Sequence, residues 1–292
     1  MSNIDLIIEE RASDIGNFLV GRLLPFRKKR MVGPFIFIDH MGPAHLPPGE
    51  KLNVGPHPHI GLSTLTYLLE GVIRHRDSLG TDIEIRPGAV NLMKAGKGIV
   101  HSERTPPSHI AEDKIVHGLQ IWLALPKEIE NSTPEFTHVE AKDIPVLKEE
   151  HLSIRCVLGE FGGMKSPVPM HSPSYMLELK ADEDVEVNIG DELFGESGLY
   201  VIEGSVETDG HVFGEKQLLI AKESTLCSFT LKKNSMAFIF GGDKFPEERF
   251  IYWNFVSSDK ETLESAKTKW KNHQFPDIEG ETDRVPLPAE KR

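Results

Sequence analysis

The segment Gly55-Pro56-His57-Pro58-His59 places two histidines at positions i and i+2. Side chains two residues apart lie on the same face of an extended strand, so both imidazoles are expected to face one cavity. Proline lacks the backbone donor that a central strand needs, which favours a sheet edge or a strand start, a suitable place for the mouth of a β-barrel. Alone the pair is a weak signal. In a chain of this histidine content, the number of His-x-His segments expected by chance is about one half.

A second pair with the same spacing follows a glycine-rich turn in Gly96-Lys97-Gly98-Ile99-Val100-His101-Ser102-Glu103. His101 and Glu103 are expected to share one face of a strand. Three neutral imidazoles and one carboxylate suit a divalent transition metal. A closed tetrahedral zinc site could use four such ligands. An octahedral ion would instead keep two open positions for substrate and dioxygen, as in non-haem iron oxygenases, whose usual triad has only two histidines.

The rest of the chain is rich in short apolar or alternating segments bounded by Gly, Pro, Asp or Asn. Such segments at spacings of about ten residues predict an all-β barrel or sandwich. The predicted strands are Ile4–Ile8, Phe35–Asp39, Thr64–Leu69, Gly118–Ala124, Ser153–Leu158, Ser174–Leu179, Gly198–Ile202, Gln217–Ala221 and Ala237–Phe240.

One segment near the C-terminus has helical periodicity instead. Ser258-Asp259-Lys260-Glu261 has the Ser-x-x-Glu form of a capping box. It precedes Thr262–Asn272, in which Leu263, Ala266 and Trp270 recur at helical spacing. We therefore predict one C-terminal α-helix, followed by a charged, proline-rich tail along the surface.

A short internal repeat divides the chain. Tyr67-Leu68-Leu69-Glu70-Gly71 matches Tyr200-Val201-Ile202-Glu203-Gly204 at an offset of 133 residues. This spacing indicates two copies of one β domain. We predict an N-terminal metal-binding domain over residues 1–130, a C-terminal domain over 146–256, and a helix and tail over 257–292. The offset places Gly190 and Glu192 where the first copy has His57 and His59, so the second copy is expected to lack a metal site.

Composition limits the classes of partner. The chain has 292 residues and a formal net charge of −12, which argues against nucleic acid and membrane surfaces as main partners. Its first residues carry acids where a signal peptide carries bases, and no apolar run reaches the length of a membrane span. The two cysteines form no CxxC pair. A reducing, cytoplasmic compartment is the expectation.

Several segments of the chain, which follow one another in the order found in a known family, carry a resemblance to that family. The chain resembles bicupins of the pirin family from about Arg22 to Pro288. The matching segments are Arg30–Phe35, Phe37–Pro43, Pro56–Gly61, Tyr67–Gly71, Ala95–Glu103, Gly118–Trp122 and Trp253–Ser258.

The resemblance implies two cupin (jelly-roll) β-barrels packed face to face, with a metal in the N-terminal barrel only. It places the ligands on His57, His59, His101 and Glu103. Fe(II) is the expected ion, although other divalent first-row metals compete for the same ligands. Several members resemble quercetin 2,3-dioxygenases, which open a flavonol ring with O₂ and release carbon monoxide. On this hypothesis Glu103 is both a ligand and the base for the flavonol hydroxyl.

The resemblance also supports an alternative. Some eukaryotic members are nuclear cofactors of transcription factors, so the chain could be an iron-dependent redox sensor that acts through a protein partner, and a nuclear location would follow for a eukaryotic source. One segment departs from the family. Familiar pirins have Arg-Gly-Phe-Glu where this chain has Ile60-Gly61-Leu62-Ser63. Two charged groups are therefore lost near the cavity, and substrate preference carries over less directly.

Overall fold

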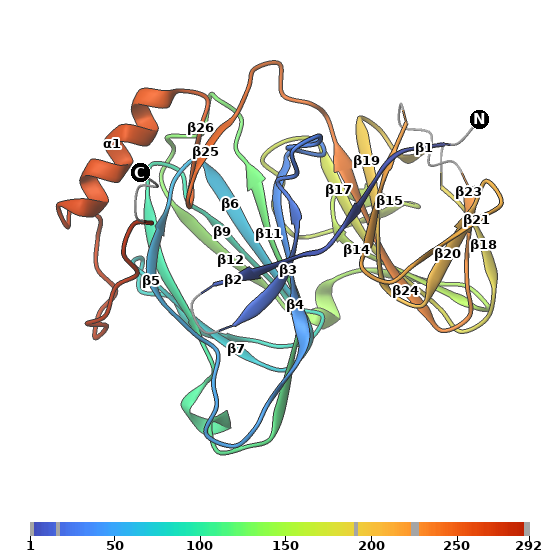
Figure 1. Ribbon diagram of the computed structural model, residues 1–292, viewed down its shortest axis with the longest axis horizontal. Coiled ribbons are helices and arrows are strands. Elements are labelled where there is room, and N and C mark those ends of the chain that lie inside the picture. The colour runs from blue at the N-terminus through green and yellow to red at the C-terminus, as the bar shows by residue number, and fades with distance from the viewer. Residues whose placement is uncertain (1–2, 16–17, 190–191, 223–227, 289–292) are drawn as a thin grey trace. The chain divides into compact units, whose positions relative to one another are not determined.

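The computed structural model describes residues 3–15, 18–189, 192–222 and 228–288, and it is mostly β-sheet (Figure 1). Each of the nine predicted strands lies within an observed strand. Within these described ranges the single α-helix, α1 (Lys260–Lys271), is close to the C-terminus as predicted. In the part of the chain that is described, no helix is long and apolar enough to cross a membrane.

The chain forms two compact units that exchange segments. We call the first the His57 unit, which comprises residues 13–20, 39–141 and 246–292. The second, the Tyr200 unit, comprises residues 1–12, 21–38 and 142–245. The sequence predicted contiguous domains instead. The N-terminal strand joins the later unit because β1 (Ile4–Glu9) pairs antiparallel with β22 (Gln217–Ala221).

Two sheets carry the His57 unit, and residues 11–12, 21–24 and 35–38 of the larger sheet belong to the Tyr200 unit. A 7-stranded sheet has the order β12-β9-β6-β11-β4-β3-β2, and a 4-stranded sheet has the order β5-β10-β7-β8. Their bounds are β12 (Glu135–Val139), β9 (Val90–Lys94), β6 (Leu62–Glu70), β11 (Lys114–Ala124), β4 (Phe35–Leu46), β3 (Leu19–Leu24), β2 (Arg11–Asp14), β5 (Asn53–His59), β10 (Ile99–Arg104), β7 (Ile73–Asp77) and β8 (Asp82–Ile85). Short 3₁₀ segments lie at Pro107–His109 and Ala141–Asp143.

The Tyr200 unit repeats this plan. Its 7-stranded sheet has the order β1-β22-β19-β24-β17-β14-β13, and its 4-stranded sheet has the order β18-β23-β20-β21. The further bounds are β19 (Glu196–Glu203), β24 (Ser235–Gly242), β17 (Ser174–Ala181), β14 (Leu152–Leu158), β13 (Val146–Lys148), β18 (Val185–Asn188), β23 (Ser228–Leu231), β20 (Ser205–Thr208) and β21 (His211–Gly214), with a small hairpin of β15 (Glu160–Phe161) and β16 (Met164–Lys165).

The repeated five-residue segment occupies the same position in both units. Tyr67 is on β6 and Tyr200 is on β19, and each side chain is buried. A glycine with positive φ follows each strand, with 88° at Gly71 and 71° at Gly204, and any other residue would be strained in this conformation. A Cβ at Gly71 would also approach the Ile115 carbonyl oxygen to 2.3 Å. The sequence repeat therefore marks two copies of one β architecture.

Helix α1 starts differently from the predicted capping box. The N-cap is Asp259, whose carboxylate accepts hydrogen bonds from the backbone N–H groups of Glu261 and Thr262. Ser258 instead donates to Glu130, so the capping-box prediction was wrong in its capping residue. The predicted apolar face was right, because Leu263, Ala266 and Trp270 are the buried residues of the helix.

That apolar face covers the strands that carry the histidines. Leu263, Ala266 and Trp270 share a core with Ile60, which follows β5, and Val100, which is on β10. The core also contains Phe255 of the hairpin formed by β25 (Phe250–Tyr252) and β26 (Phe255–Ser257). Helix α1 thus supports β5 and β10 on the side of Ile60 and Val100.

Candidate metal centre

Strands β5 and β10 bring the two predicted histidine pairs together. They pair antiparallel with His57 opposite His101, and β5 is an edge strand of its sheet. This placement accommodates Pro58, which cannot donate a ladder hydrogen bond. The pleat then directs His57 and His59 to one side of the sheet, as the i, i+2 spacing predicted, and the pairing of β10 with β5 adds His101 to them.

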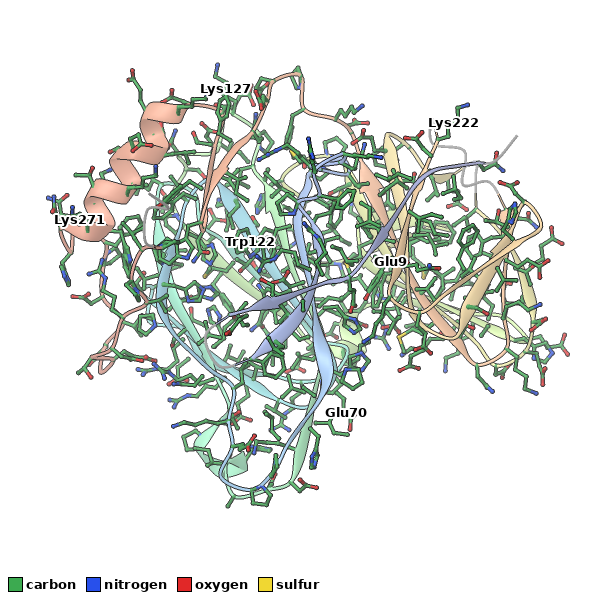
Figure 2. All side chains as sticks on the ribbon, viewed as in Figure 1. Glu9, Glu70, Trp122, Lys127, Lys222 and Lys271 are labelled. Carbon is green, nitrogen blue, oxygen red and sulfur yellow. The ribbon has the colours of Figure 1, made fainter. Side chains whose placement is uncertain are left out.

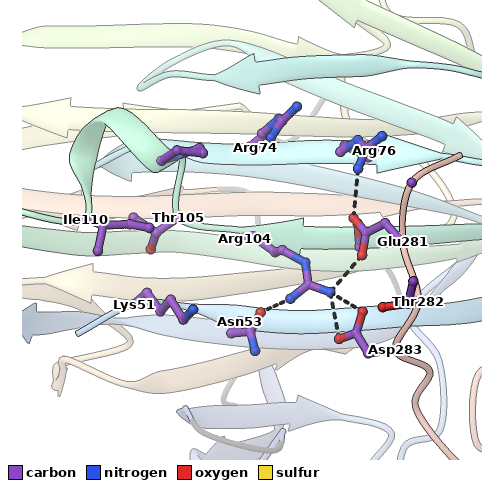
Figure 3. A pocket seen from close by; sticks show the side chains of 13 residues that line it. Lys51, Asn53, Arg74, Arg76, Arg104, Thr105, Ile110, Glu281, Thr282 and Asp283 are labelled. Atoms are coloured by element: carbon purple, nitrogen blue, oxygen red, sulfur yellow. Dashed lines mark hydrogen bonds and ion pairs between the residues drawn. The ribbon is translucent and has the colours of Figure 1, made fainter. Parts of the chain in front are cut away.

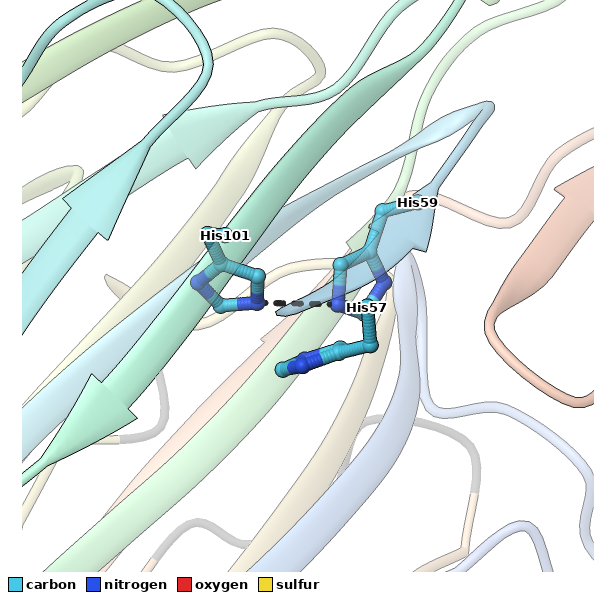
Figure 4. A group of neighbouring side chains, drawn as sticks. All are labelled: His57, His59 and His101. Carbon is cyan, nitrogen blue, oxygen red and sulfur yellow. Dashed lines mark hydrogen bonds between the residues drawn. The ribbon is translucent and has the colours of Figure 1, made fainter. Parts of the chain in front are cut away.

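The three imidazoles form a tight buried group (Figure 4). One ligand atom from each lies within 4.8 Å of the other two. The Nε2 atoms of His59 and His101 are 3.0 Å apart. Two nitrogens bound to one ion at about 2.1 Å and at a right angle would be separated by about 3 Å. The donor set therefore fits a first-row metal ion.

Burial keeps these imidazoles in the form that binds metal. Burial lowers the pKa of His57 to about 4, and it lowers the pKa of His59 and His101 well below 6.5. All three rings are therefore neutral near pH 7 and offer a lone pair. The Nδ1–H of His57 donates to the Gly55 carbonyl oxygen at 2.8 Å, which leaves Nε2 unprotonated.

Glu103 lies beside His101, on the side of another histidine, His75. Ligand atoms of Glu103, His101 and His75 lie within 4.8 Å of one another. The pairing of β10 with β5 shifts register here because β5 carries one extra residue between Val54 and His57, whereas β10 pairs with β7 without a shift. Thr66 Oγ1 donates to Glu103 Oε1 at 3.3 Å, and burial raises the Glu103 pKa. Metal ligation by Glu103 remains a prediction.

His75 was missed by the sequence reasoning. It is 3 % exposed and lies on β7, which pairs with β10 so that His75 stands opposite Glu103. A signal for it was present, because His75-Arg76-Asp77 repeats the i, i+2 spacing of two ligand-type side chains just after the Glu70-Gly71 turn.

Aromatic rings enclose the group from two other strands. Trp122 on β11, labelled in Figure 2, meets His59 edge-on with ring centroids 5.1 Å apart. Phe136 on β12 stacks on His75 at 4.7 Å. These contacts limit rotation of both imidazoles.

The Tyr200 unit has apolar side chains at the equivalent place. Its strands β18 and β23 correspond in sheet order to β5 and β10, and they contribute Val187, Phe229 and Leu231 to the core of that unit. The fixed offset was too simple: Glu192 lies beyond β18 and accepts from the Gly162 N–H, and Gly190 lies outside the described residues. Among the described residues of this unit, no three candidate ligands gather.

A pocket of about 380 Å³ adjoins β10 at Ser102 and Arg104, which alternate with His101 and Glu103 and so face away from the histidines (Figure 3). Arg104 pairs there with Glu281 and Asp283 of the C-terminal tail. The tail therefore occupies this face of the sheet, and the pocket is separate from the histidine group.

Comparison with known proteins gives family matches in both halves of the chain. The family model described as Pirin matches residues 17–123, and the model described as Pirin C-terminal cupin domain matches residues 175–276. A pirin-like protein of Caulobacter vibrioides is 43% identical over 98% of this chain and 99% of its own length.

Solved structures show the same fold. A crystal structure of quercetin 2,3-dioxygenase from Acinetobacter baumannii is 34% identical, with a TM-score of 0.88 over 98% of this chain and 97% of that one. A bacterial pirin from Escherichia coli, crystallised in complex with nickel(II), is 19% identical, with a TM-score of 0.61 over 82% of this chain and 99% of that one.

Proposed function

The chain belongs to the pirin family, and from this premise we propose that it is a metal-dependent dioxygenase that opens the ring of a flavonol such as quercetin with O₂ and releases carbon monoxide. The observation that carries the proposal is the buried group of three neutral imidazoles in the His57 unit, to which the described residues of the Tyr200 unit offer no counterpart. The similarity to a quercetin 2,3-dioxygenase over nearly the whole chain supports the substrate class.

The proposed ligands are His57, His59, His101 and Glu103, and Fe(II) is the proposed ion. Nitrogen and oxygen donors of this kind also accept other divalent first-row metals. When bound, the ion supplies Lewis acidity toward the flavonol 3-hydroxyl and redox chemistry toward dioxygen. The protein supplies the fixed donors and a buried setting.

Glu103 is the proposed base. Burial raises its pKa, which brings the carboxylate closer to the range in which it can accept a proton from the flavonol hydroxyl near neutral pH. Thr66 Oγ1 on β6 lies 3.3 Å from Glu103 Oε1, and Gln120 Oε1 on β11 lies 2.9 Å from the same hydroxyl group. Trp122 offers an aromatic surface beside His59.

Flavonol turnover by iron-loaded protein tests the proposal. Aerobic incubation with quercetin should consume O₂, release carbon monoxide and bleach the flavonol absorption band. Chelated protein and the Glu103→Gln variant should be inactive or slowed by about 10²–10⁴-fold. The matched control is His45→Asn, because His45 is an exposed histidine paired with Asp113 away from the group. Bound iron without O₂ consumption would contradict the dioxygenase and leave the redox-sensor hypothesis.

A further inference from the structure

His75 and Asp77 form a hydrogen-bonded pair on the Nδ1 side of the His101 ring. His75 Nδ1 is 3.4 Å from His101 Nδ1, the ring atom opposite the Nε2 that faces His59. On its other side, His75 Nε2 is 3.2 Å from Asp77 Oδ2. The Asp77 side chain is fully buried and that of His75 is 3 % exposed. A carboxylate, an imidazole and a candidate ligand thus form one buried chain of contacts.

The proton positions along this chain follow from Asp77. Its Oδ1 accepts the backbone N–H groups of Leu79 at 2.8 Å and Thr81 at 3.1 Å, and an ionised carboxylate can only accept. His75 must therefore carry its proton on Nε2 and present a lone pair at Nδ1. His101 then donates from Nδ1, which leaves its Nε2 unprotonated on the side of His57 and His59.

The surrounding strands hold this arrangement in place. In the pairing of β7 with β10, Asp77 is opposite His101 and His75 is opposite Glu103. Phe136 stacks on the His75 ring with an interplanar angle of 26°. Neither ring can turn freely, so the order of donors and acceptors is built into the two strands.

We propose that His75 and Asp77 are positioning residues that fix the tautomer and orientation of His101, so that its Nε2 lone pair faces the metal. This rests on the metal site of the proposed function. A metal-bound histidine commonly donates its other ring N–H to an outer acceptor, and loss of that acceptor commonly weakens metal binding about 10–100-fold. Here the acceptor is a second imidazole whose own proton is set by a buried carboxylate.

Asp77→Asn reverses this order without changing the shape of the side chain. The new amide oxygen keeps the Leu79 and Thr81 hydrogen bonds, so the amide nitrogen faces His75 and can only donate. His75 must then accept at Nε2 and move its proton to Nδ1. His101 must in turn accept at Nδ1 and carry its proton on Nε2, the nitrogen that the metal needs.

The test uses ¹⁵N NMR of the full-length metal-free protein and a titration with Co²⁺. We expect His101 to be protonated on Nδ1 in the wild type and on Nε2 in Asp77→Asn, with Co²⁺ bound about 10–100-fold more weakly by the variant. The matched control is Asp82→Asn on the neighbouring strand β8, since Asp82 is hydrogen-bonded to Arg74 and ion-paired with Arg76, and neither arginine belongs to the chain of contacts from Asp77 to His101. The control should keep both the wild-type tautomer and the wild-type affinity.

His75→Phe is a second variant that keeps an aromatic ring against Phe136. It removes the nitrogen that accepts from His101 and puts no donor in its place. His101 should therefore show a mixture of tautomers, and the protein should lose less Co²⁺ affinity than Asp77→Asn does. A wild-type tautomer and affinity in either folded variant would overturn the proposal, as would two Co²⁺ ions per chain with His75 as a ligand. Co²⁺ binding needs no flavonol, so failed ring cleavage leaves this test intact.

Discussion

The Glu130 carboxylate accepts the backbone N–H of Ser258 at 2.8 Å, immediately before the N-cap of helix α1. It also accepts the hydroxyl groups of Ser257 at 3.0 Å and Ser258 at 2.8 Å, and it is 4 % exposed. Glu130 therefore fixes the point at which the last segment of the His57 unit enters the helix. That helix in turn covers Ile60 and Val100 beside the histidines.

Glu130→Ala should destabilise the His57 unit by about 3 kcal/mol, because buried donors lose a charged acceptor. Asp259→Ala removes only the exposed helix cap and should cost about 1 kcal/mol. Urea denaturation followed by tryptophan fluorescence measures both changes. Trp122, Trp253 and Trp270 all belong to the His57 unit, so the signal reports that unit alone. Equal costs for the two variants would contradict the central role of Glu130.

These contacts also show where sequence reasoning stops. The i, i+2 rule predicted the shared face of His57 and His59 because it depends only on the strand pleat. That His101 joins them depends on the pairing of β10 with β5, which is distant in sequence. The apolar face of α1 was predicted correctly because helical periodicity is also a property of the local sequence. Ser258 was misassigned as the cap because its partner, Glu130, is distant in sequence, and a distant acceptor leaves no local pattern. The exchanged segments of the two units depend likewise on long-range pairing of strands.

His57→Ala and His101→Ala should each release the metal, since each removes one of three clustered nitrogen donors. Metal analysis of protein purified without added metal measures the change. His45→Ala serves as the control, because His45 is exposed and bonded to Asp113. This prediction holds for the dioxygenase and for the redox sensor alike. Full metal content in both histidine variants would refute the site itself.

Metal-free protein should lose stability as the pH falls from about 6.5 toward 4. The unfolded chain takes up protons near the ordinary histidine pKa of 6.5, whereas burial lowers the pKa of folded His57 to about 4. The folded state therefore binds fewer protons in this window, and the stability present above pH 6.5 is lost on acidification, by roughly 3 kcal/mol for His57.

His59 and His101 act in the same direction, because their pKa values are also lowered by burial. Glu103 acts in the opposite direction, since burial raises its pKa. Thermal unfolding of the metal-free protein at a series of pH values measures the sum. His57→Gln should flatten the decline, because it removes one titrating group. A wild-type unfolding temperature that stays constant across this window would contradict neutral, buried imidazoles.

Arg104→Gln should loosen the C-terminal tail without unfolding the sheet. Arg104 pairs with Glu281, whose side chain is 6% exposed, and with the exposed Asp283, so the loss in stability should be about 1–3 kcal/mol. The tail also donates from the Val285 N–H to the Pro56 carbonyl oxygen at 2.9 Å, at the edge of β5 next to His57. Hydrogen exchange at Val285 should therefore become faster in the variant, while exchange in β10 stays slow.

Arg86→Gln is the control, because Arg86 pairs with Glu84 away from the tail. Unchanged exchange at Val285 would mean that the edge of β5 is held by the Trp270 indole contact to the Val285 carbonyl rather than by the ion pairs.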